Sequence, residues 1–157
     1  MKRYLIFAGI LILAAATVVF AADLYSNIKV GRAISPVTVS NNDNTDSQII
    51  DTLGYKSLTF VINTTTIADT DATFTPSLIA GDDSGLSDGA TVAAGSILGT
   101  IASATFTIAD NNSVFKLGYT GPKRYVRLRI TPASNTGAAL FSAISILGHP
   151  RRGPVSQ

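Results

Sequence analysis

Residues 124–131, "RYVRLRIT", alternate apolar and polar side chains along their whole length. Successive side chains of a β-strand point to opposite faces, so this spacing predicts a strand that buries one face and exposes the other. Val126, Leu128 and Ile130 would point into a core. The residues that would point outward are Tyr125, Arg127, Arg129 and Thr131.

Seven further short runs show this spacing or are apolar throughout. "KSLTFVIN" (56–63) and "ATFTIAD" (104–110) alternate, and the second would bury Phe106 and Ile108. "ALFSAISILG" (139–148) is apolar on both faces, which predicts a covered central strand. Pro76 lies inside another run, which predicts an edge strand or a bulge there.

Turn-forming clusters separate these runs at intervals of about ten residues. Abundant Thr, Ser, Gly and Asn favour strands and turns over helices. We therefore predict an all-β fold of about eight strands for residues 23–148, an antiparallel β-sandwich of jelly-roll type. Residues 149–157 would form an extended C-terminal tail.

The first twenty-two residues differ from the rest. Lys2 and Arg3 precede an apolar run from Tyr4 to Phe20, and Ala21 ends a small-residue cleavage pattern. This layout is typical of a secretory signal peptide. A run of this length is also at the lower limit for a membrane-spanning helix, so residues 1–22 could be a retained hydrophobic helix that anchors the chain in a membrane or a capsid.

The composition disfavours enzymatic chemistry. The chain has no Cys and a single His, His149, so neither zinc nor a nucleophile paired with a histidine base is expected. The sequence lacks the G-x-S-x-G and H-E-x-x-H motifs. Asp82, Asp83 and Asp88 in "GDDSGLSDG" are weak candidates for calcium, with turn formation as the simpler interpretation. We expect no catalytic residues and no cofactor, calcium aside.

Charge is divided unevenly along the chain. All ten acids lie at or before Asp110, and seven of the twelve bases follow it. Removing residues 1–21 takes away two bases and leaves ten of each sign, which disfavours a specific nucleic-acid partner. Complementary charges suit contacts between copies of one chain, with the acidic loops at 43–46, 69–71 and 82–88 as complements. The candidate contact residues are Lys123, Arg124, Tyr125, Arg127, Arg129, His149, Arg151 and Arg152.

Four segments carry a family resemblance. They are "DLYSNIKVGRAISP", "LGYKSLTFVINTTTIADTDATFTPSLIAGDDSGLSD", "KLGYTGPKRYVRLRITPASNTGAA" and "LGHPRRGPV". The chain resembles small proteins encoded among the virion structural genes of bacteriophages and prophages. The resemblance implies a non-enzymatic coat, decoration or minor capsid protein located in the virion. Its partners would be its own copies in a homo-oligomer and a major capsid or other virion protein. Such proteins begin near the "DL" motif, so the leader is an addition here.

Two other functions remain open on the sequence alone. The leader also fits an exported β-sandwich, periplasmic or membrane-anchored through residues 4–20, that serves adhesion or ligand binding. A carbohydrate-binding module is a weaker alternative, because the chain has no Trp and few Tyr to stack on sugar rings.

Overall fold

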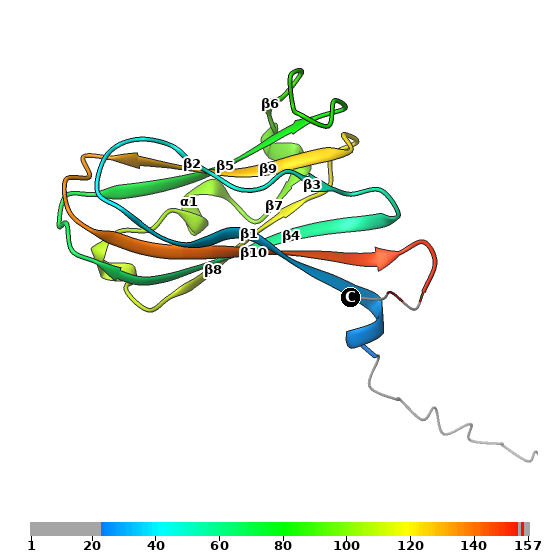
Figure 1. Cartoon of the computed structure of the whole chain (residues 1–157), viewed down its shortest axis with the longest axis horizontal. Helices are drawn as coiled ribbons and strands as arrows, with labels where there is room; N and C mark the ends of the chain where they lie inside the picture. Colours follow the sequence, from blue (N-terminus) through cyan, green and yellow to red (C-terminus); the bar gives the residue numbers. More distant parts are fainter. Residues whose placement is uncertain (1–22, 154, 156–157) are drawn as a thin grey trace, which may run out of the picture.

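The computed structural model describes residues 23–153 and 155, and within them ten antiparallel strands form two facing sheets (Figure 1). Sheet A has the order β1 (Ile28–Val39), β10 (Ala139–Pro150), β4 (Tyr55–Ile67), β8 (Val114–Tyr119) and β7 (Ile97–Leu98). Sheet B has the order β2 (Thr45–Asp46), β9 (Tyr125–Ala133), β5 (Thr73–Gly81) and β6 (Ala90–Thr91), and β3 (Ile50–Asp51) also pairs with β9. The prediction of an all-β, antiparallel, two-sheet fold is confirmed.

The hydrophobic helix predicted for residues 1–22 lies outside the described residues. Among the residues that the structure describes, no helix is long and apolar enough to span a membrane. The helical elements present there are single turns. They are η1 (Tyr25–Asn27), η2 (Ala94–Ser96), α1 (Ile101–Ala104) and η3 (Ile108–Asp110).

The core lies between the two sheets and is built by the predicted alternation. Val126, Leu128 and Ile130 of β9 are fully buried, as are Phe60 and Ile62 of β4. Each large apolar side chain removed from water in this way contributes about 1.5–3 kcal/mol toward folding. Alternation along the chain thus places the intervening residues of β9 on the outer face of sheet B.

The strand predicted over residues 104–110 is wrong. Thr100 and Thr107 each accept a backbone N–H three or two residues later and cap the turns α1 and η3. Caps of this kind stabilise a helical turn against an extended chain. Only Phe106 between the two turns keeps extended pairing, through a bridge to Phe74.

Two predictions about individual strands are refined by the structure. β10 is central in sheet A, but its outer face is not covered, because Ile144 is 40% exposed. β6 pairs with β5 only at Ile79 and Ala80. At Pro76, β5 is therefore paired with a strand on one side only, where β9 lies. A residue without an N–H is tolerated in such a position.

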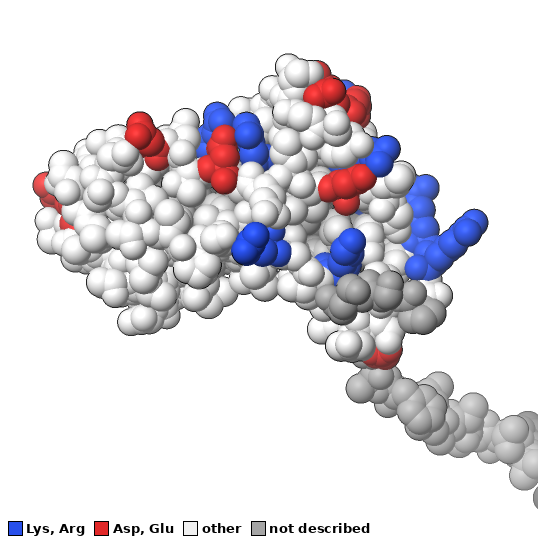
Figure 2. Space-filling view, viewed as in Figure 1, with Lys and Arg blue, Asp and Glu red and all other residues white. Residues whose placement is uncertain are grey.

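The sandwich has two ends of different charge (Figures 1 and 2). One end, at the left of Figure 1, carries loops 40–44, 68–72, 111–113 and 134–138, which contain no Lys or Arg. With η3 it holds Asp43, Asp69, Asp71 and Asp110, and we call it the acidic end. The opposite end carries loops 52–54, 82–89 and 120–124, η1 and residues 151–153. It holds cations such as Arg151 and Arg152 together with the acids Asp82, Asp83 and Asp88, and we call it the basic end by contrast with the first.

Candidate functional site

The outer face of β9 carries a network of ion pairs. The guanidinium of Arg129 donates to both oxygens of Asp46, with Nε–Oδ1 and Nη2–Oδ2 distances of 2.6 and 2.8 Å. Arg127 Nη1 lies 3.1 Å from the same carboxylate. The hydrogen bond from Arg129, followed by the nearby charge of Arg127, holds the pKa of Asp46 below its usual value.

Two further pairs continue the network toward the basic end. Arg124 donates to both oxygens of Asp51, at 2.8 and 2.7 Å, and its guanidinium lies 4.8 Å from the centre of the Tyr125 ring. Lys123 Nζ lies 2.5 Å from Asp82. Figure 2 shows acids and bases in contact on this face of the molecule. These side chains are between 43 and 62% exposed, so each pair contributes little to stability.

The predicted contact residues of β9 therefore have partners within the same chain. Asp46 and Asp82 come from two of the predicted acidic loops, whereas Asp51 was missed. Its signal is the β-branched pair Ile49 and Ile50, since Ile50 pairs with Val126 and so brings Asp51 beside Tyr125. Tyr125 and the basic residues do share one outer face, as the alternation indicated.

A buried serine links the segment between β2 and β3 to β9 by hydrogen bonds. Between β2 and β3, Ser47 donates its N–H to the Leu128 carbonyl at 2.8 Å and accepts the Leu128 N–H on its hydroxyl at 3.0 Å. Its side chain is 7% exposed. A side-chain oxygen thus replaces the backbone carbonyl that a regular strand would offer at this position.

Of the three weak calcium candidates, Asp82 pairs with Lys123, and the other two are used in turn formation. Asp83 accepts the N–H groups of Gly85 and Ser87, and Asp88 accepts those of Asp82 and Asp83. These hydrogen bonds lower the pKa of both carboxyls. Over the described part of the chain, no group of three or more Asp, Glu, His or Cys side chains is placed to hold a metal ion. The structure thus supports turn formation for the carboxylates of Asp83 and Asp88.

Asp69 stabilises the acidic end in a similar way. Its carboxylate accepts the N–H groups of Thr136, Gly137 and Asp71 together with the Thr136 hydroxyl. These bonds, led by the Thr136 N–H, lower its pKa to about 2. Asp69 therefore joins the β4–β5 turn to the β9–β10 turn.

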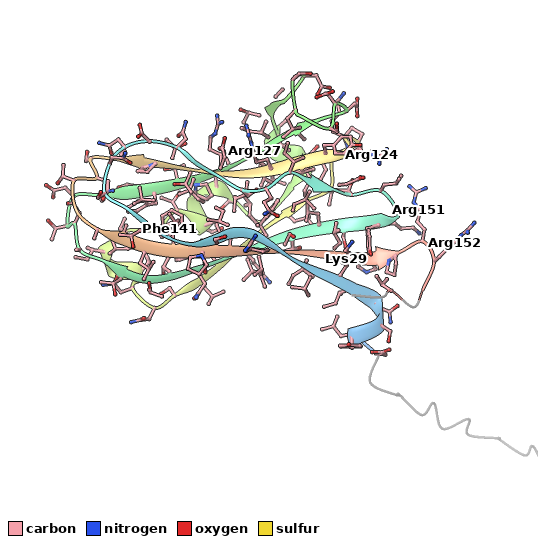
Figure 3. The ribbon with its side chains drawn as sticks, in the orientation of Figure 1. Lys29, Arg124, Arg127, Phe141, Arg151 and Arg152 are labelled. Atoms are coloured by element: carbon pink, nitrogen blue, oxygen red, sulfur yellow. The ribbon has the colours of Figure 1, made fainter. Side chains whose placement is uncertain are left out.

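The C-terminal segment docks on its own chain. β10 extends through Pro150, and His149 Nδ1 lies 2.9 Å from the Ser57 hydroxyl. Arg151 donates its N–H to the Gly54 carbonyl at 2.8 Å, and Val155 donates to Ser26 at 3.0 Å. The side chains of Arg151 and Arg152 are exposed and point outward at the basic end (Figure 3). Within the described residues, neither forms an ion pair.

The large hydrophobic side chains that remain exposed fall into two groups. One group lies on the outer face of sheet A and comprises Val30, Leu98, Val114 and Ile144. The other lies at the basic end and comprises Leu24, Tyr25 and Leu53, which are 67, 75 and 66% exposed. Clustered apolar side chains in contact with water are typical of surfaces that bind a partner. Neither group was identified from the sequence.

Comparison of the sequence with models of protein families and with curated proteins finds no match to this chain. The assignment of function therefore rests on the sequence and the geometry described above.

Proposed function

We propose that the protein is a non-enzymatic structural protein of a virion, with a jelly-roll fold that makes lattice contacts through its surfaces. The observation that carries this proposal is the strand order. For this comparison we count β2 and β3 as one strand and leave out β7, so that β8 becomes the sixth strand, β9 the seventh and β10 the last. Sheet A then holds the first, last, third and sixth strands, in the order β1, β10, β4 and β8. Sheet B holds the second, seventh, fourth and fifth. This interleaving supports the proposed jelly roll, an architecture of many viral capsid domains.

The exposed apolar residues support contacts between copies through the outer face of sheet A. Val30 and Ile144 lie on its two adjacent strands β1 and β10, and each is 40% exposed. Two charged residues lie near Ile144 on this face. Arg32 of β1 pairs directly with Ile144, and Lys116 of β8 lies on the other side, one strand beyond β4. An apolar sheet face with few charges is suited to packing against a second copy in a homo-oligomer or against a major capsid protein.

The predicted contact residues take different places in this proposal. Lys123, Arg124, Arg127 and Arg129 have acidic partners in their own chain, so their first role would be to hold sheet B together. Arg127→Asp would place a second carboxylate beside Asp46 and is expected to destabilise the monomer as well as any contact. It is therefore a poor test of assembly.

The leading alternative is an exported or membrane-anchored bacterial β-sandwich that serves adhesion or ligand binding. The observation that favours it is the basic and apolar pattern of residues 2–21, which resembles an export signal. Jelly rolls also occur in lectins, so the fold alone is compatible with this function.

One experiment separates the two functions. Nuclease-resistant particles are purified on a density gradient from a culture of the source organism, and the gradient fractions are analysed by mass spectrometry. A virion protein would sediment with the particles at a fixed ratio to a major capsid protein. Recovery only in the periplasm, the membrane or the medium, with a chain that begins at Ala22, would instead establish the exported module.

A further inference from the structure

We propose that the basic end of the sandwich is a docking surface for an anionic lipid bilayer. This inference concerns a partner other than the lattice, and it holds whether or not the chain belongs to a virion. It rests on the free cations of this end, on its exposed apolar side chains and on its position in the chain.

The first observation is the set of cations without an acidic partner. Lys56, Arg151 and Arg152 are exposed at this end, and none of them forms an ion pair within the described residues. This distinguishes them from the cations of β9, each of which contacts a carboxylate. The acids of this end without an ion pair within the described residues, Asp23, Asp83 and Asp88, accept backbone N–H groups of their own turns. A basic residue near an anionic membrane surface strengthens binding about fivefold.

The second observation is the apolar surface beside those cations. Leu53 and Tyr55 line a hollow of about 700 Å³ together with Arg151, Arg152 and Val155. Tyr25 of the neighbouring turn η1 and Leu24 just before it are mostly exposed. Cations bind headgroup phosphates, whereas leucine and tyrosine side chains enter the boundary between headgroups and acyl chains.

The third observation is the place where the described chain begins. Only Leu24 separates Asp23 from η1, and the apolar run Tyr4–Phe20 is joined to Asp23 through Ala21 and Ala22. Even a fully extended connection of this length spans only about 10 Å. A bilayer that held the apolar run would therefore lie against this end.

The charge of the opposite end agrees with this orientation. The acidic end holds four Asp, and its loops contain no Lys or Arg, so an anionic surface repels it. The sandwich would thus stand on the bilayer with its acidic end directed away.

Two other partners fit less well. A nucleic acid would pair with the cations but would leave Leu24 and Leu53 in water. The acidic end of a second copy would match the charge, but its loops 40–44 and 134–138, "SNNDN" and "SNTGA", offer no large apolar side chain to meet them. A bilayer satisfies the cations and the apolar residues together.

The test uses the absence of cysteine from the chain. Leu53→Cys and, as the matched control at the acidic end, Ser40→Cys each receive an environment-sensitive fluorophore. The full chain is reconstituted into phosphatidylcholine nanodiscs with or without phosphatidylglycerol. We expect the label at position 53 to shift to the blue in anionic nanodiscs only, the shift to fall with added salt, and the label at position 40 to remain unchanged.

A second variant tests the cations directly. Arg151→Glu combined with Arg152→Glu should lower the docked-to-undocked ratio in anionic nanodiscs about thirtyfold or more, while circular dichroism shows an unchanged fold. Equal emission at position 53 in neutral and anionic nanodiscs, or an unchanged ratio in the double variant, would overturn the proposal. Two further results would also overturn the proposal. One is a blue shift without lipid that grows with protein concentration, which indicates binding to a second copy. The other is a blue shift that duplex DNA produces more strongly than anionic nanodiscs do.

Discussion

At the scale of the residue, one carboxylate holds two guanidinium groups. The side chains of Asp46, Arg127 and Arg129 are 28, 25 and 31% exposed, so water screens their charges only in part. Asp46→Asn keeps the shape and removes the charge, which leaves two partly desolvated cations without an acid. We expect the free energy of unfolding to fall by about 1–3 kcal/mol in urea titrations followed by circular dichroism.

The matched control for this change is Asp43→Asn. Asp43 is exposed in the loop just before β2 and contacts Asn41, two residues away. Its replacement should change the free energy of unfolding by less than about 0.5 kcal/mol. Equal losses in the two variants would show that Asp46 has no special role in sheet B.

The low pKa of Asp69 gives a prediction about acid stability. Because the pKa is about 2 in the folded chain and near 3.8 in the unfolded chain, the unfolded state binds the proton first as the pH falls. The stabilisation by Asp69 is therefore present above about pH 4 and is lost as the pH falls toward 2. Asp69→Asn should destabilise the protein at neutral pH and lose most of that effect near pH 2, as measured by urea unfolding at both pH values. A constant difference would contradict the prediction.

At the scale of the element, the segment β2–β3 depends on few contacts. β2 and β3 pair with β9 over two residues each, and Ser47 bridges the interval by bonding both the N–H and the carbonyl of Leu128. Ser47→Ala leaves the buried Leu128 N–H without its acceptor and should cost about 1–3 kcal/mol of unfolding free energy. Hydrogen exchange at the Leu128 amide would report the local opening, and Ser40→Ala in the exposed loop is the control that should leave the exchange unchanged.

The segment α1–η3 makes one large contribution to the core. Phe106 is fully buried, stacks on Phe74 at 5.1 Å between ring centres and meets Phe141 edge-on at 5.7 Å. Phe106→Ala should lower the free energy of unfolding by about 3–5 kcal/mol. Val114→Ala, at a position that is 65% exposed, should change it by less than about 0.5 kcal/mol. A small loss at Phe106 would mean that this segment packs only loosely on the sheets.

The elements that the sequence predicted well are those whose pattern is local. β4 and β9 alternate over many residues, so their inner faces could be named from the chain alone. β2 and β3 are two residues long and are held by partners far along the chain, such as Arg129, eighty-three residues from Asp46. Residues 104–110 alternate like a strand, but two threonine caps outweigh that pattern. Such distant pairs and caps leave little trace in local periodicity.

The candidate site was predicted in the same partial way. Alternation placed Arg127 and Arg129 on one outer face, and the structure confirms that placement. The alternation has no means of identifying the acid that each cation meets, because that depends on how the loops fold over β9. The exposure of apolar residues such as Leu53 could not be predicted for a related reason, since exposure depends on how the whole molecule packs.

At the scale of the whole molecule, the acidic and basic side chains are distributed unevenly over the surface. Of the ten aspartates, Asp46, Asp51 and Asp82 neutralise the basic residues of β9 and the loop before it, and four lie at the acidic end. The other three, Asp23, Asp83 and Asp88, lie at the basic end. Arg151 and Arg152 remain unneutralised at the basic end. The charged side chains of the acidic end are thus all acids, whereas the basic end carries both signs, and an apolar sheet face lies between the two ends.

That sheet face gives the last prediction. If lattice contacts use the outer face of sheet A, the chain should self-associate through Ile144 at its centre, and the sedimentation coefficient should rise with protein concentration. Ile144→Asp adds a charge at a position that is already 40% exposed, so the monomer should stay folded while burial of the face becomes unfavourable. The variant should sediment as a monomer at every concentration, whereas Ser40→Asp at the acidic end should associate like the natural chain. Identical sedimentation of Ile144→Asp and the natural chain would exclude this face as the contact between copies.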